Sequence, residues 1–396
     1  MRFPPAQASE EQIQELLTQL VRVPSVNPYD APPDGQLTGE QRLAEWVANW
    51  LETAGLEVDL QEVLPQRPKV VARLKGRDSS RALLLSGHLD TVGISGMSGD
   101  PYSCQLRNGR LYGRGACDAK GSLAAFMLAL RGLVVEGIQP PIDVVLSAVV
   151  DEEHLARGTQ HFLSQWDPGC RIMGAVIGLP TELAVITSHK GVFRFKIKTS
   201  GRSAHTAMPW EGDNAIDRMN QVMNYIREEV VGELNRKNHP LVGRPSIMST
   251  EISGGQAINE VPHSCELTLT RWLIPGEATN LIWPRYKVEI EGLIPGRIEV
   301  GKPDNICLPM NTPGGVNLIR SLTGILDRYG LESEPVGGAY ASDGGYLSQR
   351  GISCLLFGPG AMSEAHQPNE SIELRQVATA TKLIWELAIR FEEWDR

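Results

Sequence analysis

Hydrophobic residues recur along the first part of the chain in two spacings, one typical of helices and one typical of strands. Residues 10–23 and 38–54 carry apolar side chains every three or four positions, which is the spacing of an amphipathic helix. From residue 70, short apolar runs alternate with further helical segments. The predicted strands are 70–74, 82–85, 143–150 and 175–177, and the predicted helices between them are 122–135 and 158–165. Uninterrupted apolar strands separated by helices are typical of a sheet covered on both faces, so we predict an α/β domain with a mostly parallel sheet.

The pattern changes after residue 190. Residues 192–199 alternate apolar and basic side chains, which predicts a strand with one face in water. A helix (213–234) and three more alternating segments, predicted as strands, follow: 246–253, 264–270 and 287–294. The α/β pattern then returns with a helix at 315–329, a strand at 352–357 and a helix at 374–394. We therefore predict a domain of residues 1–187 and 305–396, interrupted by an α+β insert of residues 188–304.

Charge and composition narrow the range of partners. The 38 Lys and Arg residues against 47 Asp and Glu residues give a formal net charge of −9, without a basic run, so we expect no nucleic-acid or membrane partner. No apolar stretch reaches the roughly 20 residues that span a bilayer. Residues 1–10 lack the apolar core of a signal peptide. The six scattered cysteines fit a reducing compartment, and we expect a cytoplasmic protein.

Candidate chemistry gathers where the predicted strands end, as is usual in open α/β sheets. The strand 82–85 leads to His88 and Asp90, the strand 143–150 leads to Glu152 and Glu153, and the strand 352–357 leads to His366. A glycine-rich turn at 113–121 presents Asp118. Each piece alone has an ordinary structural explanation as a polar turn or a helix start. Together, imidazole and carboxylate groups without clustered thiolates are typical of an open, catalytic site for zinc or a neighbouring metal, which predicts a hydrolase.

Seven motifs, in order along the chain, carry a resemblance to a known family. They are SGHLDTV (86–92), LYGRGACDAKG (111–121), DEE (151–153), HKG (189–191), SGRSAHTAMP (200–209), GGQAINEVP (254–262) and FGPGAMSEAHQPNE (357–370). The chain resembles the co-catalytic zinc amidohydrolases that include acetylornithine deacetylase, succinyl-diaminopimelate desuccinylase and carboxypeptidase G. The resemblance covers nearly the whole chain and implies a catalytic domain with an inserted dimerisation, or lid, domain.

The resemblance implies a role for each metal-site residue. His88 would bind one metal ion, His366 the other, and Asp118 would bridge both. Glu153 would complete the site of His366. Asp90 would fix the tautomer of His88, as metal-bound histidines usually require. Glu152 would be the general base, because a carboxylate beside a bridging water can take its proton and return it to the leaving amine.

The resemblance also implies a homodimer. His205 would reach from the insert into the site of the partner subunit and polarise the scissile carbonyl, and Asn259 would bind substrate. The long strand and helix of the insert support pairing about a two-fold axis, because an exposed sheet edge and an apolar stripe need covering.

Two positions depart from the family pattern. Leu179 stands where the family has a glutamate ligand, so the site of His88 keeps only His88 and Asp118 unless Glu182 joins it. Trp272 stands where many relatives carry an arginine that binds the substrate carboxylate, which makes Arg271 a candidate for that role. We therefore expect one tightly bound zinc ion and a weaker second site, with cobalt or manganese as possible substitutes.

Three functions are compatible with these residues. The first is a hydrolase of the amide bond of an N-acyl amino acid, favoured because Asp118, Glu152, Glu153, His205 and His366 are all present. The second is a metallocarboxypeptidase or dipeptidase on the same scaffold. The third is a catalytically inactive homologue that binds an amino-acid derivative or serves as a structural partner. Metal content and an amide-hydrolysis assay distinguish the third from the first two.

Overall fold

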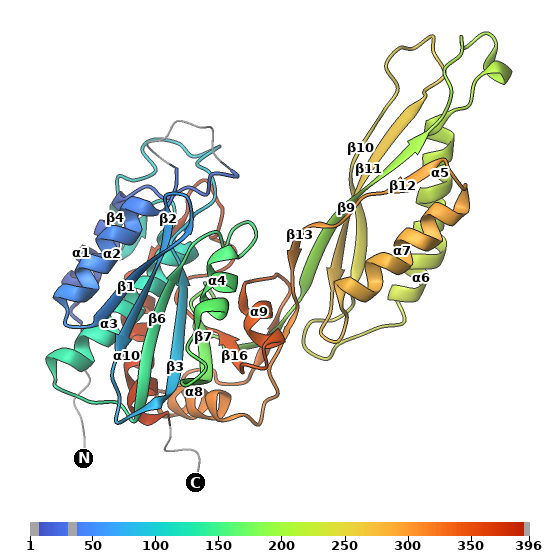
Figure 1. Ribbon diagram of the computed structural model, residues 1–396. Helices are drawn as coiled ribbons and strands as arrows, with labels where there is room; N and C mark the ends of the chain where they lie inside the picture. The colour runs from blue at the N-terminus through green and yellow to red at the C-terminus, as the bar shows by residue number, and fades with distance from the viewer. Residues whose placement is uncertain (1–7, 31–37, 392–396) are drawn as a thin grey trace. The chain divides into compact units, whose positions relative to one another are not determined.

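The computed structural model describes residues 8–30 and 38–391, and the chain divides into two compact units (Figure 1). The first unit contains residues Met1–Thr187, Asn311–Val336 and Tyr346–Arg396, and the second contains Ser188–Met310 and Gly337–Gly345. The second unit extends past residue 304 because β13 (Asp304–Cys307) pairs with β9 (Gly191–Ser200). Most of residues 1–10, and the end of the helix expected at 374–394, lie outside the described residues.

The first unit is built on a mixed sheet whose centre is parallel. Its order is β1 (Glu57–Leu64), β2 (Arg67–Leu74), β6 (Ile142–Val149), β3 (Asp78–His88), β7 (Arg171–Ile177), β16 (Cys354–Leu356), β8 (Ile186–His189) and β14 (Met310–Asn311), with β15 (Val336–Gly338) paired to β8. The four strands from β6 to β16 are parallel, and the pairs β1–β2, β2–β6 and β16–β8 are antiparallel. This confirms the predicted mostly parallel α/β sheet.

Helices cover this sheet. They are α1 (Glu10–Arg22), α2 (Gln41–Thr53), α3 (Gly121–Val135), α4 (Arg157–Gln165), α8 (Asn317–Arg328), α9 (Gly344–Gln349) and α10 (Leu374–Arg390). The helix α1 begins with a capping box, in which the Ser9 and Gln12 side chains each accept the other's N–H. The helix α3 is buried along nearly its whole length because it packs on β3 and β6 and also contacts α1 and α10.

A small sheet in the first unit links distant parts of the chain. Its strands are β17 (Ser371–Glu373), β5 (Arg110–Tyr112) and β4 (Gln105–Arg107). The short π-helix η1 (Ala116–Lys120) follows β5 and leads into α3. Because β17 pairs with β5, the segment that ends at Glu370 lies beside the glycine-rich turn.

The second unit is an antiparallel sheet with helices along one face (Figure 1). The sheet order is β10 (Ser246–Gly254), β11 (Ser264–Leu273), β9 and β12 (Ile298–Val300). The helical segments are η2 (Pro209–Glu211), α5 (Ala215–Tyr225), η3 (Ile226–Val230), α6 (Val231–Leu234) and α7 (Thr279–Leu293). Along β9, Phe193, Phe195 and Ile197 are buried against these helices, as their alternation predicts.

One predicted strand is wrong. Of the segment 287–294, residues 287–293 form the end of α7 and not a strand. The local alternation of apolar and charged residues is outweighed by helical spacing, since Tyr286 and Ile290 are four positions apart and both fully buried. Lys287 and Glu291 form an ion pair over the same interval on the outer side.

Candidate metal centre

The four predicted metal ligands converge in the first unit. They are His88 at the end of β3, Asp118 in η1, Glu153 after β6, and His366 after β16. Nε2 of His88 lies 3.2 Å from Oδ1 of Asp118. Nε2 of His366 lies 3.2 Å from Oδ2 of Asp118 and 3.2 Å from Oε2 of Glu153. Because each histidine faces a different oxygen of Asp118, this carboxylate can bridge two cations.

Strand pairing explains why these residues meet. The strands β3 and β6 are parallel neighbours with His88 opposite Val149, so the residues that follow both strands emerge at the same edge of the sheet. One ligand atom from each of His88, Asp118 and Glu153 lies within 4.8 Å of the others. The candidate ligands that follow β3 and β6 therefore lie together at this edge, as expected from the strand ends.

The electrostatics of this cluster favour positive charge. Hydrogen bonds with Asp118 and Glu153 raise the pKa of His366 to about 11. Burial raises the pKa of Glu153 to about 7, and the nearby charge of Asp118 adds to this effect. The carboxylates of Asp118 and Glu153 thus stabilise positive charge on His366, and a cation bound at the same place would be stabilised by the same negative charges.

The donor set fits a divalent transition metal. Imidazole nitrogens and carboxylate oxygens are the usual ligands of catalytic zinc and its neighbours. Oε1 of Glu153 is buried without a hydrogen-bond partner among the described residues, and a buried carboxylate oxygen normally has one. A metal ion held by these residues would satisfy that oxygen.

Glu152 is half-buried beside Glu153. Burial opposes charge on His88, but hydrogen bonds with Asp118 and Asp90 and the nearby charge of Glu152 raise the pKa of His88. The charge of Glu152 therefore acts on His88, one of the candidate metal ligands.

The carboxylate of Asp90 makes different contacts from those expected. Nδ1 of His88 donates to the main-chain carbonyl oxygen of Asp90 at 2.8 Å, while carboxylate oxygen Oδ1 is 3.7 Å away. The carboxylate instead accepts the N–H groups of Glu152 and Glu153, both at 3.1 Å. The backbone of Asp90 therefore orients His88, and its side chain holds the turn that carries the two glutamates.

Glu370 organises the glycine-rich turn, a role that we did not assign from the sequence. This buried carboxylate accepts the N–H groups of Gly115, Cys117 and Asp118 at 2.8 to 3.0 Å. It also forms an ion pair with Arg114 at 2.6 Å. The available signal was an acidic residue at the end of the seventh motif, four positions after His366.

Leu179 stands where the family pattern has a glutamate ligand, and neither Leu179 nor Glu182 offers a ligand atom to the cluster of His88, Asp118 and Glu153. Leu179 is buried and its side chain carries no ligand atom. Glu182 is exposed with φ of +54°, and its N–H donates to the carbonyl oxygen of Gly360 at 2.7 Å. In the described chain, the group of ligand atoms within 4.8 Å of one another does not include Glu182.

Three candidates lie in the second unit. His205 is exposed, and it lies beside the segment of Asn259, because Thr206 N–H donates to the carbonyl oxygen of Asn259 at 3.1 Å.

Arg271 does not suit the substrate-binding role expected for it. It is fully buried, and its guanidinium group donates to both carboxylate oxygens of Glu277 and to the hydroxyl of Tyr286. These contacts stabilise the fold of the second unit and leave Arg271 inaccessible to substrate.

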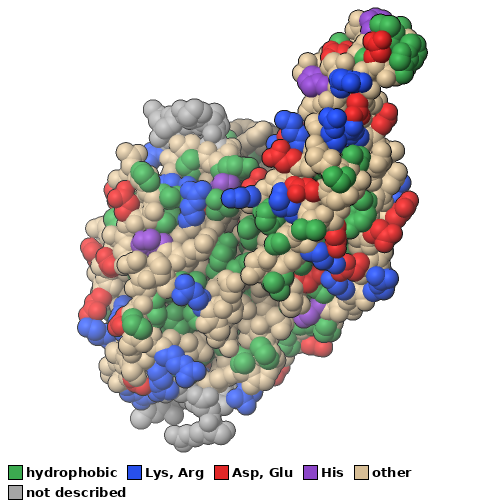
Figure 2. Space-filling model, turned by 45° about the vertical axis from the view of Figure 1, so that its right-hand side comes forward, with side chains coloured by type: hydrophobic (Ala, Val, Ile, Leu, Met, Phe, Trp, Pro, Cys, Tyr) green, Lys and Arg blue, Asp and Glu red, His purple; other side chains and the backbone are tan. Residues whose placement is uncertain are grey.

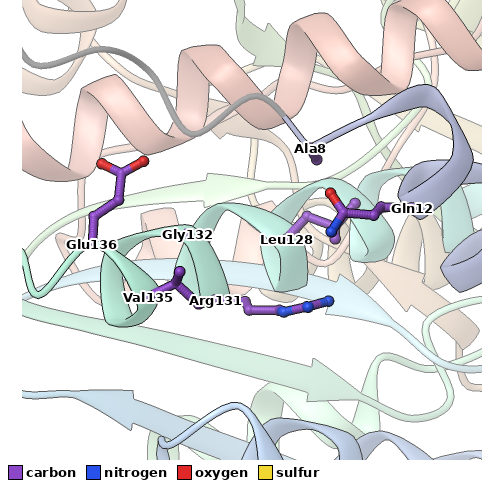
Figure 3. A pocket seen from close by; sticks show the side chains of 7 residues that line it. All are labelled: Ala8, Gln12, Leu128, Arg131, Gly132, Val135 and Glu136. Atoms are coloured by element: carbon purple, nitrogen blue, oxygen red, sulfur yellow. The ribbon is translucent and has the colours of Figure 1, made fainter.

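A hollow elsewhere on the first unit has no connection with this chemistry. It has a volume of about 290 Å³ and lies between α1 and α3 (Figure 3). It is lined by Ala8, Gln12, Leu128, Arg131, Gly132, Val135 and Glu136. None of the candidate residues is among them.

Charged side chains of both signs are interspersed over the face of the molecule shown in Figure 2.

Comparison with known proteins identifies the family. Residues 84–390 match the model of peptidase family M20/M25/M40. The chain belongs to this family. It is 30% identical to the acetylornithine deacetylase of Photorhabdus laumondii over 386 residues, which cover 95% of this chain and 96% of that protein. Family membership confirms the resemblance stated from the motifs and makes the chain a hydrolytic enzyme.

Solved structures share the fold. A tripeptidase from Staphylococcus aureus aligns with a TM-score of 0.78 at 16% identity, covering 98% of this chain and 99% of that one. A Bacillus subtilis protein described as a dinuclear metal binding peptidase of the M20 family aligns with a TM-score of 0.72 at 17% identity, covering 97% and 99%. Among the described residues, none of the helices of this M20 family member has the length and apolar composition needed to cross a membrane.

Proposed function

We propose that this M20 family member is a metal-dependent hydrolase that cleaves the amide bond of an N-acyl amino acid. The observation that carries the proposal is the convergence of His88, Asp118, Glu153 and His366 at one sheet edge, with Glu152 beside them. The similarity to an acetylornithine deacetylase along nearly the whole chain supports an acyl amino acid as substrate.

The residues present fit zinc, with cobalt or manganese as substitutes, and His88, Asp118, Glu153 and His366 would hold it. When bound, such an ion lowers the pKa of a coordinated water and polarises the substrate carbonyl. Glu152 accepts the proton of the attacking water and returns it to the departing amine nitrogen, so that the amine leaves neutral. Asp90 holds the main chain of Glu152 and Glu153 during this transfer.

A substrate panel tests the proposal. The purified protein is loaded with zinc, cobalt or manganese and supplied with N-acetyl amino acids, N-succinyl amino acids and dipeptides, and the released amine is measured. We expect turnover of N-acyl amino acids to exceed that of dipeptides, and Glu152→Gln to lower it by about 10²- to 10⁴-fold. A preference for dipeptides would support the carboxypeptidase or dipeptidase alternative. Metal binding without hydrolysis of any substrate would support an inactive homologue.

A further inference from the structure

A buried polar network lies behind the turn that carries Glu152 and Glu153. Its members come from five separate segments of the chain and are nearly or fully buried: Asn27, Glu40, Arg67, Asp90 and Asp151. None of them is among the four candidate metal ligands. Burying charged groups destabilises the folded protein unless their hydrogen bonds are satisfied. The contacts of this network therefore indicate what it stabilises.

Asn27 connects the two carboxylates of this network. Its side-chain amide donates to Oδ2 of Asp90 at 2.8 Å and to Oδ1 of Asp151 at 3.2 Å. Asp90 in turn accepts the N–H groups of Glu152 and Glu153. The amide group of Asn27 therefore links Asp151, the first residue of the turn, to Asp90, which accepts hydrogen bonds from the two residues that follow Asp151.

The Glu40–Arg67 pair holds Asp151 from the other side. Arg67 donates to both carboxylate oxygens of Glu40 at 2.6 Å and lies 3.0 Å from Oδ1 of Asp151. Glu40 also accepts the N–H of Asp151 at 3.2 Å. Both the main chain and the side chain of Asp151 are thus bound by a single bidentate ion pair.

These contacts act on a strained residue. Asp151 has φ of +65°, in the left-handed region that non-glycine residues seldom adopt. Such a conformation persists only where the surrounding structure enforces it, and here it directs the chain from β6 into the turn of Glu152 and Glu153.

We propose that Asn27 and the Glu40–Arg67 pair are positioning residues for the reaction. Through Asp90 and Asp151 they keep the turn of residues 151–153 in the conformation in which Glu153 meets Asp118 and His366, with Glu152 beside them. The catalytic part of this inference rests on the proposed function. The part that concerns metal binding depends only on the geometry of Glu153.

The same sheet offers a matched control. Asp143, at the opposite end of β6 from Asp151, is also fully buried and forms an ion pair with Arg73. It accepts hydrogen bonds from the N–H of Gly76 at 2.7 Å and the hydroxyl of Ser79 at 2.8 Å. Asp143 resembles Asp151 in its own burial and in its ion pair with an arginine, the side chain of Arg73 being 31% exposed against 11% for Arg67. It lies at the other end of β6 from the candidate metal ligands.

The experiment compares Asn27→Leu and Arg67→Met with the control Arg73→Met. Metal affinity is measured by competition with a chelator, the melting temperature of the metal-free protein by calorimetry, and kcat and KM on the best substrate of the panel. We expect all three variants to melt at lower temperature. Only Asn27→Leu and Arg67→Met should lose about 10- to 100-fold in metal affinity and in kcat, with KM changed little. Arg67→Lys, which keeps the charge but not the bidentate geometry, should recover part of that loss.

Unchanged metal affinity and kcat in Asn27→Leu and Arg67→Met would overturn the proposal. So would equal losses in Arg73→Met, since these would follow from reduced stability alone. If either network variant does not fold, Asn27→Ser and Arg67→Lys answer the same question. A wild-type protein that cleaves no amide would refute the proposed function. It would not decide the positioning role, because metal affinity is measured without substrate and tests that role separately.

Discussion

Two adjacent glutamates in the candidate metal centre have different surroundings. Glu153 lies 3.2 Å from His366 and has a buried oxygen that lacks a partner among the described residues, which suits a metal ligand. Glu152 is half-buried next to it and acts on His88 through its charge, which suits a base that must reach solvent and substrate. In the proposed mechanism, a one-residue difference in position thus separates metal binding from proton transfer.

Exchanging each glutamate for glutamine should separate these tasks. Glu152→Gln should lower kcat by about 10²- to 10⁴-fold and leave metal content unchanged, because general base catalysis contributes about that much. Glu153→Gln should lose bound metal. Elemental analysis and steady-state kinetics on both variants check this. Near-normal turnover by Glu152→Gln would refute the assignment of the base.

Leu179 predicts unequal metal binding. Asp118, Glu153 and His366 form a three-residue ligand set, whereas His88 shares only Asp118. A chelator titration followed by elemental analysis should therefore remove one equivalent of metal well before the other. Leu179→Glu should raise the affinity of the weaker site about tenfold or more. If wild type loses both equivalents together, and Glu182→Gln abolishes this, then Glu182 completes the site.

At the scale of elements, the end of β8 carries a buried histidine. His189 donates from Nδ1 to the carbonyl oxygen of Lys190 at 2.7 Å, and its Nε2 lies 2.9 Å from the hydroxyl of Ser342, from which it accepts. Burial lowers the pKa of His189 to about 4. Protonation would place a charge in a buried position and remove the acceptor of Ser342.

This depressed pKa predicts a pH dependence of stability. The contribution of neutral His189 is fully present above its unfolded pKa of 6.5 and is lost as the pH falls toward about 4. Between pH 7 and pH 4 the unfolding free energy of the wild type should therefore fall by about 3 kcal/mol more than that of His189→Gln. The other titratable groups are the same in both proteins, so their contributions cancel in this difference. Urea unfolding of both proteins at several pH values measures the difference. A difference that stays constant with pH would contradict the prediction.

At the scale of the whole molecule, we propose a homodimer with shared sites. The strand β10 forms an edge of its sheet, and its residues Met248 and Ile252 are more than half exposed. Pairing of two such edges about a two-fold axis would cover them. His205 and Asn259 lie on neighbouring segments of the same unit, and the family resemblance implies that His205 acts in the partner's site.

Subunit mixing tests this assembly. Glu152→Ala and His205→Ala homodimers should both be inactive, and their hybrid should contain one intact site, because the base and the histidine come from different chains. Random mixing should restore about a quarter of wild-type activity. Light scattering should give about twice the chain mass of 43.4 kDa. Hybrids that form without any recovery, or a fully active monomer, would rule out shared sites.

Some of the fold and site could be predicted because short-range patterns encode them. Apolar runs predicted the parallel strands. Positions after the strand ends singled out His88, Glu153 and His366 as candidate ligands, and the glycine-rich turn singled out Asp118. The strand expected at 287–294 was wrong because packing of Tyr286 and Ile290 outweighed a short alternation. Arg271 was misjudged because its charge gave no indication that Glu277 and Tyr286 enclose it.

The sequence by itself determined the α/β class, the family and the residue types of the candidate metal centre, since these depend on spacing and on motifs of a few residues. Only the tertiary structure decided which oxygen of Asp118 faces which histidine, and that Glu370 holds the glycine-rich turn. The same is true of the network of Asn27, Glu40 and Arg67. The physical reason is that these hydrogen bonds join residues far apart in the chain, as in the contact between Asn27 and Asp151, and no local pattern specifies such partners.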